Sequence, residues 1–222
     1  MKFLTWVSHG LKRLRPAHNP EHYYEEYERL SKADLSQVEI FRVIKEWCAG
    51  RKNVLEVGCG IGYLANYLGA SGADMNEEAI RRAKDHYPHL KFYCCGVQDT
   101  QLPAHSFDAI ICNNIFEHLE DDIREQAYRE LQRIATPDAI IIYGYSDPYH
   151  PMEILSGFSK FDKGLLDPTH IHNWSVGGFI KELRKYLRVE EARRVSIFAK
   201  FLPYSQVFKG AVVVRCAVKT EV

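Results

Sequence analysis

The stretch VLEVGCGIGYL, residues 54–64, constrains the fold more than any other part of the chain. Its apolar run predicts a buried strand over 53–57, and the apolar spacing after the run predicts a helix. Between these two elements Gly58, Gly60 and Gly62 stand at alternate positions. Glycines at such a turn let the backbone approach a ligand closely while helix N–H groups point at it. The stretch therefore predicts a nucleotide-binding α/β unit.

The rest of the chain alternates between strand-like and helix-like patterns. This alternation predicts right-handed βαβ units in one α/β domain. We expect a Rossmann-like, doubly wound seven-stranded sheet that is mostly parallel and ends in an antiparallel C-terminal hairpin. After a first helix that ends near Gly50, helices are expected over 77–87 (capped by Asn76), 121–135 and 175–187, and strands over 90–97, 107–113, 138–145, 189–199 and 209–219.

Composition excludes several classes of protein. Lys plus Arg and Asp plus Glu both number 29, so the formal net charge is zero and no overall field attracts nucleic acid. No run approaches the ~18 apolar residues of a membrane span. The six cysteines include no CxxC pair, and several lie in strand-like runs where free cysteine behaves as a small buried hydrophobe. We therefore expect a cytoplasmic protein.

The glycine spacing discriminates between nucleotides. NAD and FAD sites use GxGxxG, but here Tyr63 occupies the position of the third glycine, which disfavours an NAD-dependent oxidoreductase. The turn also lacks the GxxxxGK[ST] pattern of a P-loop. Glu56 precedes the glycines, and its carboxylate is suited to accept hydrogen bonds from an ammonium group, which a dinucleotide lacks.

The segment EVGCGIG resembles the first motif, (D/E)xGxGxG, of class I S-adenosylmethionine-dependent methyltransferases, and the resemblance extends from about Leu35 to the C-terminus. In that family the loop wraps the methionine part of the cofactor, S-adenosyl-L-methionine, and the acid orients its amino group. The resemblance assigns Glu56 to the acid and the cofactor loop to Gly58, Cys59, Gly60 and Gly62.

Two further motifs complete the expected cofactor site. Asp74 in GADMNEEAIRRAK matches the acid that accepts from both ribose hydroxyls, and Met75 resembles the apolar residue that lies against adenine. The string GVQDTQLPAHSFDAIICNNIFEHLED resembles the family pattern gDaxxLPxxxxSFDxVxxxxxxEHLxD. Gln98 aligns with the adenine-contacting acid and Asp99 follows it, so both are candidates. Asn113 falls where the fourth strand lines the cofactor.

The acceptor class is narrowed by motifs that the chain lacks. Enzymes that methylate exocyclic nitrogens carry (D/N)PPY after the fourth strand, whereas this chain has NNIF there, and no Pro-Cys pair of a cytosine-C5 enzyme occurs. We therefore expect a small molecule or a sugar- or lipid-linked intermediate as acceptor, with an oxygen acceptor marginally favoured, and no nucleic acid.

The EHL segment allows three interpretations. His118 is a candidate general base, because its unperturbed pKa lies near neutrality. Alternatively, Glu117 and His118 tie the strand end to the next helix. In ubiquinone-type O-methyltransferases, which bind a divalent metal, another Glu stands four residues before the His, but that position is Asn114 here. We therefore expect no metal.

Residues 146–174 follow the fifth strand, where the family inserts a substrate-recognition loop. DPTHIHNWSV resembles the DPTH run of bacterial methyltransferases that modify small molecules, sugars and lipid-linked intermediates, which makes His170 a candidate for acceptor contact or general base. The alternative is a turn in which Asp caps the backbone. His170 and His172 cannot share a helix face, so these histidines with His150 do not predict a zinc site.

Residues 1–34 are expected to form a helical extension and cofactor lid, and residues 35–222 the methyltransferase domain. The first twenty residues predict a basic amphipathic helix that docks either on the domain or on a membrane surface or acidic partner. Tyr24, on the following acidic helix, either reaches the cofactor carboxylate or packs in the ordinary way. The alternative to an enzyme is a non-catalytic S-adenosylmethionine-binding module that acts through a protein partner.

Overall fold

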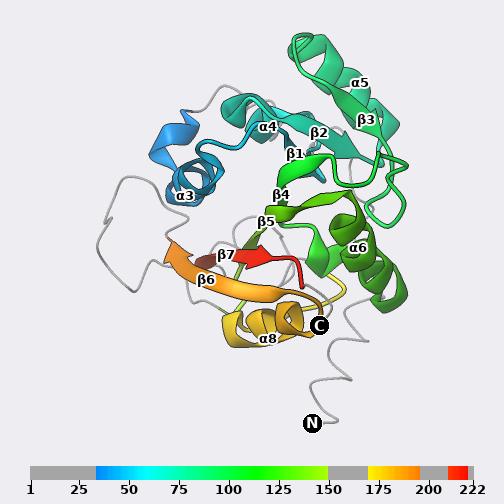
Figure 1. The fold of residues 1–222 in the computed structure, drawn as a ribbon. Coiled ribbons are helices and arrows are strands. Elements are labelled where there is room, and N and C mark those ends of the chain that lie inside the picture. Colours follow the sequence, from blue (N-terminus) through cyan, green and yellow to red (C-terminus); the bar gives the residue numbers. More distant parts are fainter. Residues whose placement is uncertain (1–33, 150–169, 196–209, 220–222) are drawn as a thin grey trace, which may run out of the picture.

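The computed structural model describes residues 34–149, 170–195 and 210–219. Within these ranges seven strands form one sheet in the order β3-β2-β1-β4-β5-β7-β6 (Figure 1). Strands β1 to β5 pair in parallel, whereas β7 runs antiparallel to both β5 and β6. The predicted doubly wound sheet with an antiparallel C-terminal pair is confirmed. The strands are β1 (Val54–Val57), β2 (Ser71–Asp74), β3 (Phe92–Cys94), β4 (Phe107–Asn113), β5 (Ala135–Ser146), β6 (Arg188–Val195) and β7 (Ala211–Ala217).

Side-chain caps mark the starts of α5 and α8. Asn76 caps α5 by accepting from the Ala79 N–H, as its position before the helix predicts, and Ser175 caps α8 in the same way. None of the helices in the described ranges is long and apolar enough to cross a membrane. The helices and short 3-10 helices (η) of the described ranges are η2 (Leu35–Gln37), α3 (Glu39–Cys48), α4 (Tyr63–Leu68), α5 (Glu77–His86), η3 (Phe116–His118), α6 (Asp121–Ile134) and α8 (Val176–Tyr186).

Helices cover both faces of the sheet, so the central strands are apolar on both sides. Ile110 and Cys112 of β4 pack in a core with α6 and α8, while Ala109 and Ile111 pack in a second core with α3. This alternation follows from the two-residue period of a strand. Figure 1 shows α3 and α6 on opposite sides of the central strands. The result is a three-layer arrangement that leaves the carboxyl ends of the strands for a site.

Strand β3 is shorter than expected. The apolar pattern predicts a strand over 90–97, but pairing with β2 ends at Cys94. The Cys95 N–H still donates to the Asp74 carbonyl, after which an isolated antiparallel bridge joins Gly96 to Asp99. The chain therefore reverses direction at Gly96, and the expected end of this strand is wrong because a local turn interrupts the apolar run.

A cluster of polar side chains holds the segment after this turn against α6. The buried Glu130 carboxylate accepts from the backbone N–H and hydroxyl of Thr100 and from the Arg133 guanidinium, which also donates to the Leu102 carbonyl. These charge-assisted bonds, chiefly those from Arg133, lower the pKa of Glu130 to about 2. The Glu130 cluster thereby fixes the segment that carries Gln98 and Asp99.

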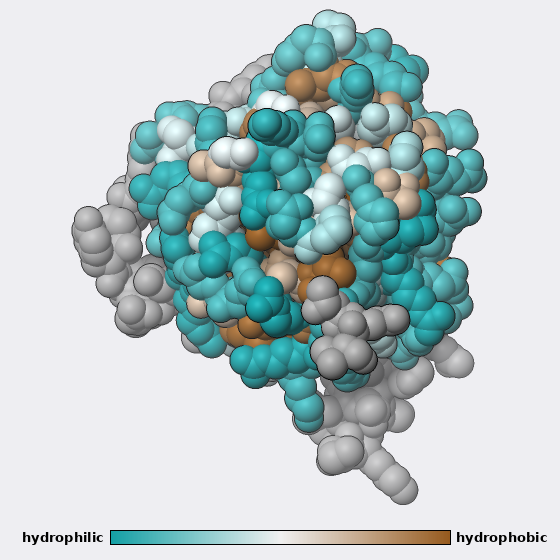
Figure 2. Space-filling model, in the orientation of Figure 1, coloured by the Kyte–Doolittle hydropathy of each residue, from teal (hydrophilic) through white to brown (hydrophobic). Residues whose placement is uncertain are grey.

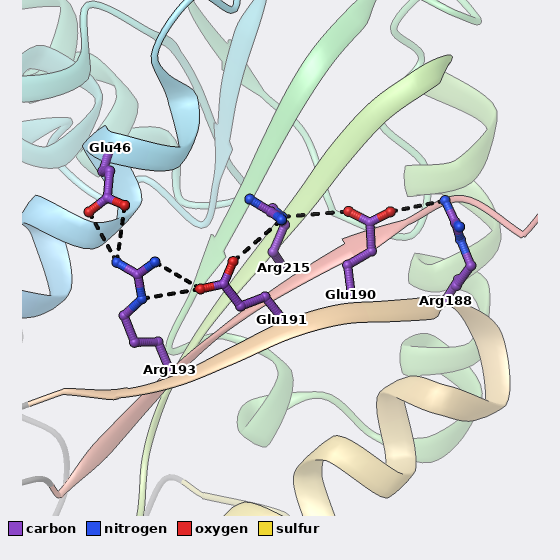
Figure 3. A network of polar contacts seen from close by, with 6 residues as sticks. All are labelled: Glu46, Arg188, Glu190, Glu191, Arg193 and Arg215. Carbon is purple, nitrogen blue, oxygen red and sulfur yellow. Dashed lines mark hydrogen bonds and ion pairs between the residues drawn. The ribbon is translucent and has the colours of Figure 1, made fainter.

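The edge strand β6 is polar and charged. Its charged residues form ion pairs with one another, with Arg215 of β7 and with Glu46 of α3, and acids and bases alternate along this row (Figure 3). Charged side chains protect a sheet edge from pairing with other chains. The face in Figure 2 is mostly hydrophilic, with hydrophobic residues in small separate patches. The row consists of Glu46, Arg188, Glu190, Glu191, Arg193 and Arg215.

Candidate functional site

The glycine turn lies at the carboxyl edge of the parallel strands, between β1 and β2. The backbone N–H groups of Gly58 and Cys59 both donate to the Ala73 carbonyl, at 2.8 and 3.0 Å. The turn is therefore fastened to the end of β2. Ligands of doubly wound sheets bind at this edge, where the strand order reverses.

Gly58 has to be glycine for two reasons. Its φ is +71°, a conformation that L side chains rarely adopt. A Cβ at this position would also lie 2.2 Å from the Cγ2 atom of Ile115. The expected cofactor loop therefore packs directly on Ile115, in the segment after β4 that also carries Glu117 and His118.

Asp74, at the end of β2, organises the turn. Its carboxylate accepts from the Gly60 N–H at 2.8 Å and from the Asn76 N–H at 2.9 Å, one bond to each oxygen. Two carboxylate oxygens offer about four acceptor positions, so two remain for ligand hydroxyls. The next side chain, Met75, is 76% exposed and forms an apolar surface at the same edge.

Two buried acceptors lie at the ends of the adjacent strands β1 and β4. Glu56 is 4% exposed, and neither its Oε2 atom nor the Oδ1 atom of Asn113 has a hydrogen-bond partner among the described residues. Burial raises the pKa of the Glu56 carboxyl well above its usual range, and the Asp74 carboxylate adds to the rise. Buried acceptors without donors are costly. An ammonium group carries three donors and would satisfy either acceptor, so both residues are candidates to hold the amino group of S-adenosyl-L-methionine.

The two candidates for the adenine contact differ in exposure. The half-buried Gln98 side chain folds over Gly96, whose hypothetical Cβ would lie 2.5 Å from the Gln98 Oε1 atom. Asp99 is exposed, and its N–H donates to the Gly96 carbonyl. Both stand after β3, on the same edge of the sheet as Asp74, so both residues remain candidates.

The structure brings together the two histidines predicted as catalytic. The rings of His118 and His170 lie 4.8 Å apart between centroids, and the His170 Nε2 atom lies 4.0 Å from the Glu117 Oε1 atom. The Glu117 backbone carbonyl accepts from the N–H groups of Ile171 and His172, at 2.8 and 3.0 Å. The segment after β4 is thus joined to one that lies more than fifty residues later in the sequence.

Tyr145 anchors the segment that carries His170, and sequence reasoning missed it. The Tyr145 hydroxyl donates to the Trp174 carbonyl at 2.7 Å and accepts from the Trp174 N–H at 2.9 Å. Asn173, also missed, places its Oδ1 atom 3.3 Å from the His170 Nδ1 atom. The sequence shows only a strand tyrosine and a polar turn, because these contacts form between elements distant in the chain.

A buried ion pair supports the other side of this segment. Arg124 of α6 pairs with Glu182 of α8 at 3.3 Å, and its guanidinium lies over the Trp174 ring. The His172 ring also stacks on the Trp174 indole, with 4.9 Å between ring centroids. Burial lowers the pKa of His172, and the Arg124 charge lowers it further.

Several predictions fall outside the described residues. They concern Tyr24, the basic N-terminal helix, the extension up to residue 33 and the middle of the expected recognition insertion, including His150. A cavity of about 250 Å³ lies at the opposite edge of the sheet, near Asn53 and Ser71. It is distant from the strand ends that carry the candidate site.

Comparisons with known proteins show what this chain is similar to. Residues 55–143 match a family described as "Methyltransferase domain". A ubiquinone biosynthesis O-methyltransferase of Neisseria meningitidis is 30% identical over 104 residues, which are 41% of this chain and 43% of that protein. A probable S-adenosylmethionine-dependent methyltransferase of Mycolicibacterium smegmatis is 27% identical over 131 residues, or 52% of this chain and 51% of that protein. The chain thus spans about half or less of the length of these relatives.

Solved structures show the same fold. A methyltransferase of Thermotoga maritima, described as a possible histamine N-methyltransferase, has a TM-score of 0.69 at 20% identity and covers 90% of this chain and 98% of its own. A TehB-like methyltransferase of Corynebacterium glutamicum has a TM-score of 0.64 at 22% identity, with 90% and 100% covered.

The fold and the glycine turn define a class I methyltransferase architecture. Together with the match over residues 55–143, this architecture is similar to that of S-adenosylmethionine-dependent methyltransferases, whose cofactor is S-adenosyl-L-methionine.

Proposed function

We propose that this chain transfers a methyl group from S-adenosyl-L-methionine to an oxygen of a small molecule or of a sugar- or lipid-linked intermediate. The observation that carries the proposal is the pair of buried acceptors on Glu56 and Asn113, which fit a ligand ammonium group beside the turn that Asp74 organises. The O-methyltransferase of Neisseria meningitidis supports an oxygen acceptor.

Each residue of the site is assigned to the part of the cofactor that it would contact. The cofactor supplies an activated methyl group on sulfur, and the protein has to hold the acceptor in line with it. Glu56 and Asn113 would orient the amino group, Asp74 the ribose, and Met75 the base. The turn formed by Gly58, Cys59, Gly60 and Gly62 would follow the methionine chain, with Gln98 or Asp99 at the adenine.

His118 and His170 are the proposed acceptor-side residues. Their rings are neighbours on the segments that follow β4 and β5, and either can accept a proton from an acceptor hydroxyl. In this proposal residues 146–174 form the recognition loop and residues 1–34 a lid on which Tyr24 reaches the cofactor. The basic N-terminal helix would contact the domain, a membrane surface or a partner.

Cofactor binding tests this proposal directly. Calorimetric titration of the full chain with S-adenosyl-L-homocysteine should give saturable binding, while NADH should give none. Asp74→Ala should weaken the affinity about 5- to 150-fold, because charge-assisted hydrogen bonds worth ~1–3 kcal/mol are lost. Asp85→Ala, which removes an exposed carboxylate from α5, is the matched control and should leave the affinity unchanged.

The outcomes separate the alternatives. Unchanged affinity in Asp74→Ala would remove this residue from the site. Cofactor binding without methyl transfer to any acceptor of a labelled screen would instead favour the non-catalytic binding module. Binding of NADH alone would overturn the assignment of the cofactor.

A further inference from the structure

We propose that Glu117, His118 and His170 form a binding site for a divalent transition-metal cation of the zinc class. The ligand atoms of these three side chains all lie within 4.8 Å of one another. The site extends the proposed function, because it lies on the acceptor side of the cofactor turn. The cation requires only these side chains, however, and its binding can be measured without cofactor or acceptor.

The donor set favours such a cation over magnesium or calcium. Two imidazoles and one carboxylate suit zinc and related metals, whereas Mg²⁺ and Ca²⁺ require mostly oxygen ligands. Three protein ligands also leave a fourth position open, as catalytic zinc sites do. An acceptor hydroxyl at that position would lose its proton more readily, because a bound cation lowers the pKa of a coordinated hydroxyl. With the cation bound, His118 and His170 are ligands and not bases, so this proton would pass to solvent water.

The distances are compatible with closure around an ion. Ligand atoms about 2.1 Å from a tetrahedral zinc lie roughly 3.4 Å from one another. The His170 Nε2 atom and the Glu117 Oε1 atom are 4.0 Å apart, so this pair has to approach by only about 0.6 Å. The Glu117 side chain is 1% exposed and that of His170 is 12% exposed, so little water surrounds the cluster.

The surroundings orient the ligands as metal sites require. A metal-bound histidine usually donates its second ring N–H to an oxygen acceptor. The His170 Nδ1 atom faces the Asn173 Oδ1 atom at 3.3 Å, which directs the Nε2 atom toward Glu117. The Glu117 carbonyl holds the backbone at Ile171 and His172, which fixes the approach of the two segments.

The sequence predicted no metal because the segment after β4 lacks a third ligand. In the structure a residue from another segment supplies that ligand. Asn114 stands where the ubiquinone-type pattern has its additional Glu, so the segment after β4 supplies too few ligands. His170 comes from the segment that precedes α8 and adds the third ligand. Only the pairing of these two segments makes a complete set.

Titration of the untagged, chelator-treated full chain with ZnCl₂ tests the proposal. Wild type should bind one Zn²⁺ saturably and should not bind Mg²⁺ at comparable concentration. Glu117→Gln, His118→Ala and His170→Ala should each weaken Zn²⁺ binding at least tenfold. His172→Ala, which removes a histidine of the same segment outside the cluster, is the matched control and should retain the wild-type affinity.

A positioning variant keeps the test independent of folding defects in the ligand variants. Asn173→Ala leaves all three ligands in place and should weaken Zn²⁺ binding about 10- to 100-fold through loss of the second-sphere contact. Absence of saturable Zn²⁺ binding to wild type, or equal affinity in wild type and His170→Ala, would overturn the proposal. S-adenosyl-L-homocysteine titrations of the same variants distinguish this failure from failure of the proposed function, because Asp74 and Glu56 remain intact in all of them.

Discussion

Removal of one hydroxyl, in Tyr145→Phe, should loosen the segment that carries His170. The Tyr145 ring is fully buried and stacks on Phe179 at 4.4 Å between centroids. Phenylalanine preserves this packing. It loses only the hydroxyl, which donates to the carbonyl and accepts from the N–H of Trp174.

The magnitude follows from these two bonds. Each neutral hydrogen bond contributes ~0.5–1.5 kcal/mol to stability, so the pair accounts for ~1–3 kcal/mol. Trp174 is half-buried, and its backbone groups regain some contact with water when the hydroxyl is absent. We therefore expect the free energy of unfolding to fall by about 2 kcal/mol in Tyr145→Phe.

Urea unfolding of the two proteins measures this difference, and amide hydrogen exchange reports the Trp174 N–H itself, whose protection should fall. Tyr149→Phe is the matched control. Its hydroxyl also donates to a carbonyl of the segment, that of Asn173, but at 3.2 Å from a side chain that is 53% exposed. This control should change the stability by less than ~0.5 kcal/mol. A Tyr145→Phe variant as stable as the control, with Trp174 still protected, would refute the reasoning.

Two further predictions concern the glycine turn and the support of α6. Gly58→Ala should destabilise the protein by about 2–4 kcal/mol in urea unfolding, because its Cβ adds a clash with Ile115 to the cost of a positive φ. Gly69→Ala, which has a similar φ of +68° but open space, should cost only about 1 kcal/mol, and equal losses would contradict the role of the clash. The lowered pKa of Glu130 means that its stabilisation is complete above pH ~4.5 and is lost as the pH falls toward 2. The free energy of unfolding of wild type should therefore exceed that of Glu130→Gln by about 1–2 kcal/mol at pH 6, a modest value because the Arg133 partner is partly exposed to solvent. The difference should be smaller at pH 3, and a difference independent of pH would contradict this assignment.

Much of the fold could be predicted because the signals that specify it are local. The alternation of apolar runs defined most strands, and Asn76 marked the start of α5. The exception was β3, where a short turn after Cys94 overrides the apolar pattern. Apolar periodicity indicates which face of an element is buried. It does not indicate where a turn ends the pairing of two strands.

The sequence by itself predicted the architecture and indicated the class of cofactor, because strand and helix patterns, the glycine spacing and the acid before it are properties of neighbouring residues. The tertiary structure alone decided what surrounds those residues. It left the Glu56 Oε2 and Asn113 Oδ1 atoms buried without a hydrogen-bond partner among the described residues. It also placed His170 against Glu117 and His118, with Tyr145 holding the segment in place. Such contacts join residues dozens of positions apart, and their geometry depends on how the sheet edge and its loops pack. Local sequence patterns carry no information about that packing.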